Sequence, residues 1–229
     1  MSEKICFIPA RNSSTRFKNK NIMPFGNGNL ITNTIEQAIN SDIFDRIFLS
    51  SNDESILEYA NEYRIDTHLR SDKHDQLLPV IKDFIFDNEL YEDVIGLLLV
   101  TCPLRSVDDI VNAFNIYDKF KNKCVMSVTS NENPIQLSWT KKFKNDNFLT
   151  PVMPYDYYRS TRKQDHKDTY HYNDAILIDS VENILDDERK TLFGDNPIPY
   201  IMPPERSIAI DYEHQWEFAK CLEKEKSNV

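Results

Sequence analysis

The chain has 229 residues, only four of them glycine, and its 37 acidic and 27 basic residues give a formal net charge of −10. Gly26, Gly28, Gly96 and Gly194 fit neither G-x-G-x-x-G nor G-x-x-x-x-G-K-[ST], which excludes the two commonest glycine-rich nucleotide loops. The acidic balance also disfavours nucleic acid and anionic membranes as partners, so we expect small soluble ligands.

Composition and the amino terminus indicate a globular, cytoplasmic protein. Hydrophobic residues make up 40% of the chain, which is enough for a full core. The longest core-like apolar run, Val94 to Val100, is too short to span a bilayer, so we expect no membrane association. The start of the chain lacks a signal-like apolar stretch, and export is not expected. Four cysteines without CxxC spacing favour reduced thiols over disulfides.

The first half alternates short apolar runs with amphipathic stretches, a pattern typical of parallel strands joined by crossover helices. The predicted strands are Lys4–Pro9, Arg46–Ser50, Asp66–Leu69, Val94–Val100 and Cys124–Val128. The predicted helices between them are Ile31–Asn40, Glu54–Glu62, Leu77–Phe86 and Val107–Phe120. Asp53 and Ser106 are suited to cap two of these helices. We therefore expect a Rossmann-like, three-layer α/β/α sandwich with a mostly parallel sheet.

The rhythm changes in the second half. Residues 131–172 are rich in Asn, Lys, Asp, Tyr and Pro with weak periodicity, which predicts an inserted arm. Ordered elements resume after it, and the chain returns to the sheet, so we expect one domain, 1–229, with an excursion. The predicted elements are strands Ala175–Ile178, Ile198–Ile201 and Ser207–Ile210, a helical patch at Val181–Asp187, and a closing amphipathic helix Tyr212–Lys224.

A cluster of basic residues follows the first predicted strand. Arg11, Arg16, Lys18 and Lys20 place four cations within ten residues of an acidic chain. Ligands of parallel α/β sheets bind at the carboxyl ends of strands, where this loop begins. The amides and hydroxyls of residues 12–15 are suited to wrap phosphate oxygens, with a tight turn expected at Asn12. This loop either binds a polyphosphate or is a solvated basic loop, and the clustering of its cations favours polyphosphate binding.

Six segments follow one another in order along the chain. The first is Ile8-Pro9-Ala10-Arg11-x-x-Ser14-x-Arg16-x-x-x-Lys20-Asn21. The others are Phe48-Leu49-Ser50-Ser51-Asn52-Asp53, Leu69-Arg70-Ser71, Leu98-Leu99-Val100-Thr101-Cys102-Pro103-Leu104-Arg105, Tyr172-Asn173-Asp174-Ala175-Ile176, and Ile208-Ala209-Ile210-Asp211 with Trp216-Glu217-Phe218-Ala219. Together they resemble the cytidylyltransferases that activate sialic acid and related ulosonic acids. That resemblance implies the sandwich of nucleotide-diphospho-sugar transferases, with the arm used for dimerisation.

The resemblance also implies a reaction. The anomeric hydroxyl of a 2-keto-3-deoxy sugar acid attacks the α-phosphorus of CTP, giving a CMP-sugar and pyrophosphate. By resemblance, Arg11 and Lys20 are catalytic cations that hold the triphosphate and stabilise charge on the leaving pyrophosphate. The implied nucleotide-binding residues are Ala10, Arg11, Asn12, Ser14, Arg16, Lys20, Asn21 and Arg70.

A divalent metal, Mg²⁺ or Mn²⁺, is expected to bridge the phosphates with one or two carboxylates as ligands. The resembling motif has two aspartates at positions i and i+2, and this chain has Ala209 at the first and Asp211 at the second. Asp211 is therefore the predicted metal ligand and a third catalytic residue. The alternative is that Asp211 only caps the last helix.

The implied sugar site departs further from the family pattern. Leu99 stands where the family commonly has glutamine, and Asp174 stands where it has glycine. Arg162-Lys163-Gln164 resembles the segment that meets the sugar carboxylate, for which a guanidinium fork is a suitable partner. The predicted sugar-binding residues are Leu99, Thr101, Arg162, Gln164, Tyr172 and Asn173.

Cys102, the aromatic stretch 155–159 and the five histidines are further candidates for a functional role. Cys102, at a predicted strand end, is either a nucleophile or a small packing residue, and packing is favoured because no histidine neighbours it in the sequence. The aromatic stretch 155–159 either lines the sugar pocket or, as favoured, packs in the homodimer that the resemblance implies. The five histidines show no zinc-site spacing.

The leading hypothesis is thus a CTP-dependent enzyme acting on a sialic-acid-like sugar. Ala209 and Leu99 motivate a rival, a noncatalytic homologue that binds nucleotide or sugar. A third possibility is a nucleotidyltransferase of the same fold with another sugar or base.

Overall fold

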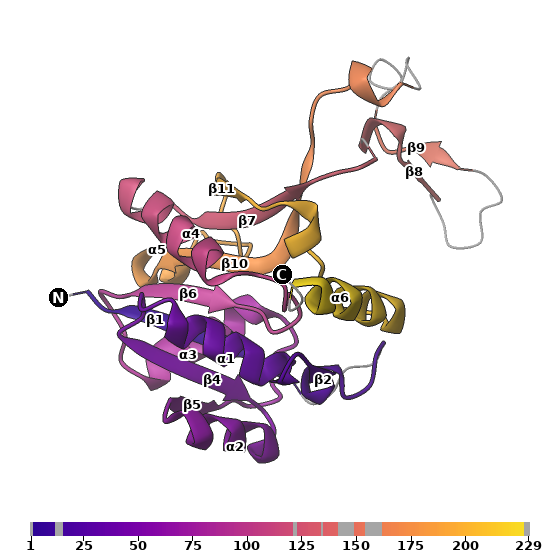
Figure 1. Cartoon of the computed structure of the whole chain (residues 1–229). Helices are drawn as coiled ribbons and strands as arrows, with labels where there is room; N and C mark the ends of the chain where they lie inside the picture. Colours follow the sequence, from indigo (N-terminus) through magenta and orange to yellow (C-terminus); the bar gives the residue numbers. More distant parts are fainter. Residues whose placement is uncertain are drawn as a thin grey trace.

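A seven-stranded sheet organises the fold (Figure 1). The computed structural model describes residues 2–11, 16–120, 123–133, 135–141, 149–153 and 162–226. From edge to edge the strands are β11 (Ile198–Ile201), β7 (Val125–Ser130), β10 (Tyr170–Ser180), β6 (Val94–Leu98), β1 (Lys4–Pro9), β4 (Arg46–Ser51) and β5 (Asp66–Leu69). Only β10 runs antiparallel to its neighbours in this sheet. The prediction of a mostly parallel, Rossmann-like sheet is confirmed.

Six α-helices lie in the described part of the chain. They are α1 (Leu30–Asn40), α2 (Glu54–Tyr63), α3 (Leu77–Asp87), α4 (Val107–Lys119), α5 (Val181–Leu185) and α6 (Glu213–Lys226). Both predicted caps are confirmed, because the Asp53 side chain accepts from the Ser55 amide and Ser106 forms a capping box with Asp109. No described helix is long and apolar enough to cross a bilayer.

The core is divided between the two faces of the sheet. Side chains alternate along a strand, so Ile5 and Phe7 of β1 face one side while Cys6 and Ile8 face the other. The first face packs against α3 and α5, and the second against α1, α2, α4 and α6. This gives the three layers that the sequence predicts.

Short elements complete the described chain. β2 (Pro24–Phe25) pairs with β3 (Gly28–Asn29), and β8 (Trp139–Thr140) with β9 (Thr150–Pro151). The short 3-10 helices are η1 (Lys20–Ile22), η2 (Ile135–Leu137), η4 (Lys163–Asp165) and η5 (Pro204–Arg206). The described pieces that carry η2, β8, β9 and η4 stand away from the sheet (Figure 1). The stretch 155–159 lies outside the described residues.

The predicted strand Ser207–Ile210 is wrong. These residues join no ladder; after Pro203-Pro204 and η5 the chain crosses the ends of the strands, where the Ile210 amide donates to the Thr101 carbonyl at 2.8 Å. The apolar pattern arises because Ile210 is buried in the core during this crossing. Strand Ala175–Ile178 is part of the longer β10, whose residues Tyr170 to Tyr172 pair with β7 inside the predicted arm.

Candidate functional site

The basic loop leaves the sheet at the carboxyl edge, toward which β1, β4 and β6 point in Figure 1. Ala10 is fully buried, and its amide donates to the Ser50 carbonyl at 2.8 Å. The amide of Arg70, directly after β5, donates to the Ser51 carbonyl at 2.9 Å. These two bonds to β4 bring the chain segments of Arg11 and Arg70 to the same edge of the sheet.

Lys20, Arg16 and Asp211 form one charged cluster at this edge. The Lys20 ammonium lies 2.9 Å from Asp211 Oδ1 and donates to the Ile210 carbonyl at 2.7 Å. Arg16 Nη2 lies 3.1 Å from Asp211 Oδ2. The Lys20 side chain is only 12% exposed, so water weakens its attraction to an anion little. The fold thus joins predicted catalytic residues that are 191 positions apart.

Arg11, Asn21 and Arg70 form a second group. The Asn21 amide nitrogen donates to the Arg11 carbonyl at 2.7 Å, and Arg11 Nη2 donates to the His74 carbonyl at 2.8 Å. Burial, and then the nearby charge of Arg11, lower the pKa of Arg70 to about 10. Two adjacent guanidinium groups favour an anion between them.

This second group has hydrogen-bonding capacity left over. Asn21 Oδ1 and Arg70 Nη2 are buried and have no partner within the described residues. Buried polar atoms are nearly always satisfied, so an unmet acceptor and an unmet donor indicate a place for a polar ligand. Arg11 also pairs with Asp75 at 3.3 Å, a partner that the sequence did not suggest.

The described loop turns at Asn19, whose φ of 56° is left-handed and which precedes η1. The turn expected at Asn12, and the nucleotide role predicted for Asn12 and Ser14, lie outside the described residues.

The predicted sugar residues fall into two places. Leu99 and Thr101 follow β6 at the carboxyl edge, and Tyr172 and Asn173 belong to β10. Arg162 and Gln164 are exposed in and beside η4, on the piece that stands away from the sheet (Figure 1). Within the described part of one chain, the fold does not bring these two to the charged cluster.

Tyr172 and Asn173 differ in their bonding. The Tyr172 hydroxyl is buried without a partner among the described residues, and its ring packs on Phe193. Asn173 is 1% exposed; it accepts from Ser127 at 2.6 Å and donates to Ser207 at 2.9 Å. Its amide is therefore committed to holding β7, β10 and the segment before Asp211 together.

Asp174 is a site residue whose role the sequence did not reveal. Its backbone has a φ of 59°, the left-handed conformation that explains why glycine suits this position in the family. Burial, and then the charge of Asp211, raise the pKa of Asp174, while Lys20 and Arg16 lower it. Asp174 thus belongs to the electrostatic environment of the charged cluster.

We expect Asp174→Asn to raise the free energy of unfolding at pH 7 by roughly 0.5 kcal/mol, the scale of a partly exposed charge–charge interaction. The pKa of Asp174 in the folded state lies above its unfolded value, so the ionised acid opposes folding at neutral pH. The gain should vanish as the pH falls below about 4, where the acid is protonated in both states. Urea unfolding at several pH values measures it.

Asp42→Asn is the matched control for this substitution. Asp42 is also left-handed, with a φ of 52°, but it is exposed. An equal gain in both variants would show that backbone conformation, and not the charge of Asp211, limits stability at Asp174.

Cys102 is fully buried, and its thiol lies 3.5 Å from the Arg206 carbonyl oxygen. Burial raises the pKa of Cys102 to about 12, so the thiolate needed for nucleophilic attack is scarce at neutral pH. This environment favours the packing role.

A mostly parallel sheet with cations gathered at its carboxyl edge is the arrangement expected of an α/β protein that binds anionic ligands. The family profile described as Cytidylyltransferase matches residues 5–220. Pseudaminic acid cytidylyltransferase from Campylobacter jejuni is 31% identical over 97% of this chain and 97% of that relative. The chain belongs to the cytidylyltransferase family, as the six segments predict.

Further similar proteins are consistent with this family. N-acylneuraminate cytidylyltransferase from Escherichia coli is 30% identical over 97% of this chain, which spans about half (52%) of that relative. The solved structure of CMP:2-keto-3-deoxy-manno-octonic acid synthetase complexed with CTP has a TM-score of 0.73 at 12% identity, covering 98% of this chain and 100% of that one. At this identity the likeness concerns the fold.

Proposed function

We propose that this chain couples CTP to a 2-keto-3-deoxy sugar acid of the sialic-acid type and releases pyrophosphate. The observation that carries the proposal is the convergence of Lys20 and Arg16 on Asp211 at the carboxyl edge of the sheet. The likeness to the pseudaminic acid and N-acylneuraminate enzymes supports the sugar class.

The reaction requires positioning and charge neutralisation more than covalent help. The anomeric oxygen forms a bond to the α-phosphorus, the bond to the β-phosphate oxygen breaks, and pyrophosphate leaves with that electron pair as the hydroxyl proton is released. Arg11 and Lys20 hold the triphosphate and stabilise the leaving charge. Asn21 Oδ1 and Arg70 Nη2 remain available for the base and ribose.

The proposed metal is Mg²⁺ or Mn²⁺, with Asp211 as its protein ligand. The Asp211 carboxylate suits such an ion, because it is 31% exposed and offers hard oxygen donors. Phosphate oxygens and water would supply the remaining ligands, as Mg²⁺ prefers. When bound, the ion would neutralise phosphate charge. Lys20 and Arg16 can then exchange Asp211 for phosphate oxygens.

For the sugar, we propose that Arg162 and Gln164 serve the site of a second copy of the chain. The exposure of both residues, on a piece that stands away from the sheet, supports a homodimer with shared sites (Figure 1). Leu99, Thr101 and Tyr172 complete the proposed pocket, and Asn173, whose amide is bonded within the fold, holds the neighbouring elements in place. Light scattering tests the dimer, and a monomeric mass would contradict it. We place the enzyme in the cytoplasm.

Pyrophosphate release tests the function. We expect turnover when the protein is given CTP, Mg²⁺ and a panel containing neuraminic, legionaminic, pseudaminic and eight-carbon ulosonic acids. Asp211→Asn should lower the rate about 100-fold or more, because one anionic ligand of the metal is lost. Omission of Mg²⁺ should have a comparable effect.

The rival functions have distinct outcomes in the same assay. Silence across the panel, with calorimetry still detecting CTP binding, would support the noncatalytic homologue that Ala209 motivates. Turnover with ATP, GTP or UTP instead of CTP would indicate a related nucleotidyltransferase.

A further inference from the structure

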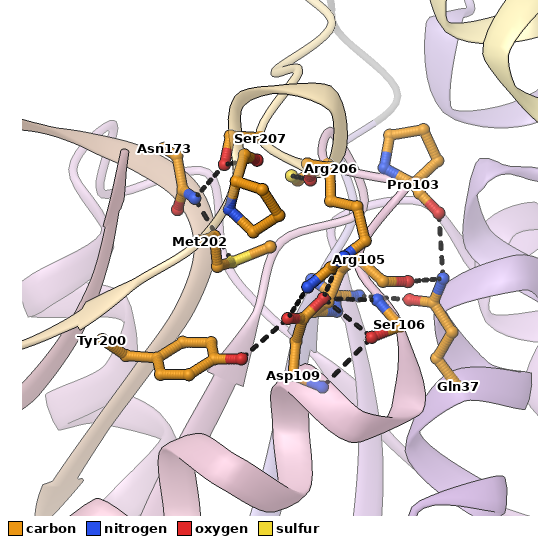
Figure 2. Close-up of polar contacts among 12 residues, drawn as sticks. Gln37, Pro103, Arg105, Ser106, Asp109, Asn173, Tyr200, Met202, Arg206 and Ser207 are labelled. Carbon is orange, nitrogen blue, oxygen red and sulfur yellow. Dashed lines mark hydrogen bonds and ion pairs between the residues drawn. The ribbon is translucent and has the colours of Figure 1, made fainter. Parts of the chain in front are cut away.

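The segment from Met202 to Asp211 carries the proposed metal ligand but belongs to no strand. Separate bonds, and not a ladder, hold it to the sheet: Asn173 in β10 donates to Ser207 (Figure 2), and the Ile210 amide donates to the Thr101 carbonyl after β6. Without a ladder, the position of Asp211 depends on side chains that anchor this segment. One such anchor is Arg206, five residues before Asp211 in the chain.

Arg206 binds Asp109 through both arms of its guanidinium. Nε donates to Asp109 Oδ2 and Nη2 to Asp109 Oδ1, each at 2.9 Å. The side chain of Asp109 is 1% exposed, whereas that of Arg206 is 31% exposed. A bidentate fork fixes orientation as well as distance, which a single lysine ammonium does not.

The same carboxylate is tied to two further elements. It accepts from the amide and hydroxyl of Ser106, at 2.8 and 2.9 Å, in the capping box of α4. It also accepts from the Tyr200 hydroxyl in β11 at 2.7 Å. Burial raises the pKa of Asp109, but hydrogen bonds, first from Arg206, outweigh burial and lower it overall. Asp109 is therefore a rigid, charged anchor.

The segment after Arg206 connects the Arg206–Asp109 pair to the charged cluster. Next to Arg206, Ser207 accepts from Asn173 at 2.9 Å, and the Ile210 amide donates to Thr101 at 2.8 Å. The Ile210 carbonyl and the Asp211 carboxylate then receive Lys20. Among the described residues, the hydrogen bonds of Arg206 and Asp109 go to residues outside the charged cluster.

We propose that the Arg206–Asp109 pair is a positioning device that sets where the Asp211 carboxylate meets Lys20. The proposal rests on the proposed function, since it concerns how that site binds CTP with its metal. A displacement of about 1 Å at a reacting group lowers rates about 100-fold, so a loosened anchor has a measurable effect.

A double-mutant cycle between Arg206→Lys and Asp211→Asn tests the proposal. Arg206→Lys keeps the charge and loses the fork; we expect kcat/KM for CTP to fall about 10-fold. If Arg206 acts through Asp211, the double variant should be no slower than Asp211→Asn alone. The affinity for CTP with Mg²⁺, measured by calorimetry without sugar, should follow the same pattern.

Arg189→Lys provides the matched control. Arg189 forms an even more buried pair with Asp179, at the opposite edge of the sheet. Arg189→Lys should lower the temperature midpoint of unfolding. At a temperature where every variant is folded, it should leave kcat/KM unchanged, and the double variant with Asp211→Asn should be no slower than Asp211→Asn alone. Tyr200→Phe, which removes one bond to Asp109, is expected to lower kcat/KM about 3-fold and covers the case in which Arg206→Lys does not fold.

The outcomes separate this proposal from the proposed function. If the losses in kcat/KM of Arg206→Lys and Asp211→Asn multiply in the double variant, the positioning role alone is overturned. Unchanged kinetics in both Arg206→Lys and Tyr200→Phe would overturn it as well. Failure of the wild-type protein to bind CTP with Mg²⁺ would overturn the proposed function, and the positioning role with it.

Discussion

Lys20→Ala is expected to lower kcat/KM for CTP by about 10²–10³-fold, the loss seen when one preorganised group that stabilises developing charge is removed. The ammonium is nearly buried and lies between the Ile210 carbonyl and Asp211. Alanine leaves that carboxylate with Arg16 as its cation and removes a positive charge from the proposed triphosphate site. Steady-state kinetics with varied CTP measures the loss, and Arg11→Ala should also lower turnover strongly.

Lys4→Ala is the control for this prediction. Lys4 pairs with Asp118 at 3.1 Å and lies at the start of β1, at the amino edge of the sheet. Its loss should leave kcat/KM unchanged. If Lys20→Ala unfolds at ordinary temperature, or loses no more activity than Lys4→Ala, then Lys20 has a structural role only.

Asp179→Ala is expected to lower the free energy of unfolding by about 3–5 kcal/mol, because it leaves a buried guanidinium without its counter-charge. The Arg189 and Asp179 side chains are 5% and 2% exposed, and Asp179 also accepts from Asn183 at 2.8 Å. Urea unfolding followed by circular dichroism measures the change.

Asp66→Ala removes the carboxylate of an exposed pair for comparison. Asp66 lies 3.0 Å from Arg46, with side chains 47% and 39% exposed, so the change should be only about 0–1 kcal/mol. If Asp179→Ala and Asp66→Ala lose the same free energy of unfolding, burial does not increase the contribution of the Asp179 pair to stability. Asp179→Ala should keep its CTP kinetics wherever it is folded, because Asp179 lies at the edge opposite the charged cluster.

Local sequence patterns were sufficient to predict elements whose buried side chains recur with a regular period. β1 has the bounds Lys4–Pro9 that its apolar run predicts, since β1 is buried on both faces. The N-caps at Asp53 and Ser106 also followed from neighbouring residues, because a cap needs only a side-chain oxygen next to the first turn. The family was evident from six short segments, and its profile matches residues 5–220.

Local patterns failed where the chain is held by distant partners. Ser207 to Ile210 has a strand-like apolar alternation, yet single bonds to Asn173 and Thr101 hold it across the sheet. The contribution of Asp174 to the charged cluster was equally hidden, since it depends on a left-handed backbone and on the nearby charge of Asp211.

Apart from the wrong strand Ser207–Ile210, the sequence by itself determined the order of sheet strands and helices, the basic loop after β1 and membership of the cytidylyltransferase family. These features depend on side-chain periodicity and on short contiguous segments. Only the tertiary structure decided that Lys20 meets Asp211 and that Asp109 receives Arg206. Those pairs join residues far apart in the chain, and strand order and layer packing bring their backbones close enough for the charges to interact.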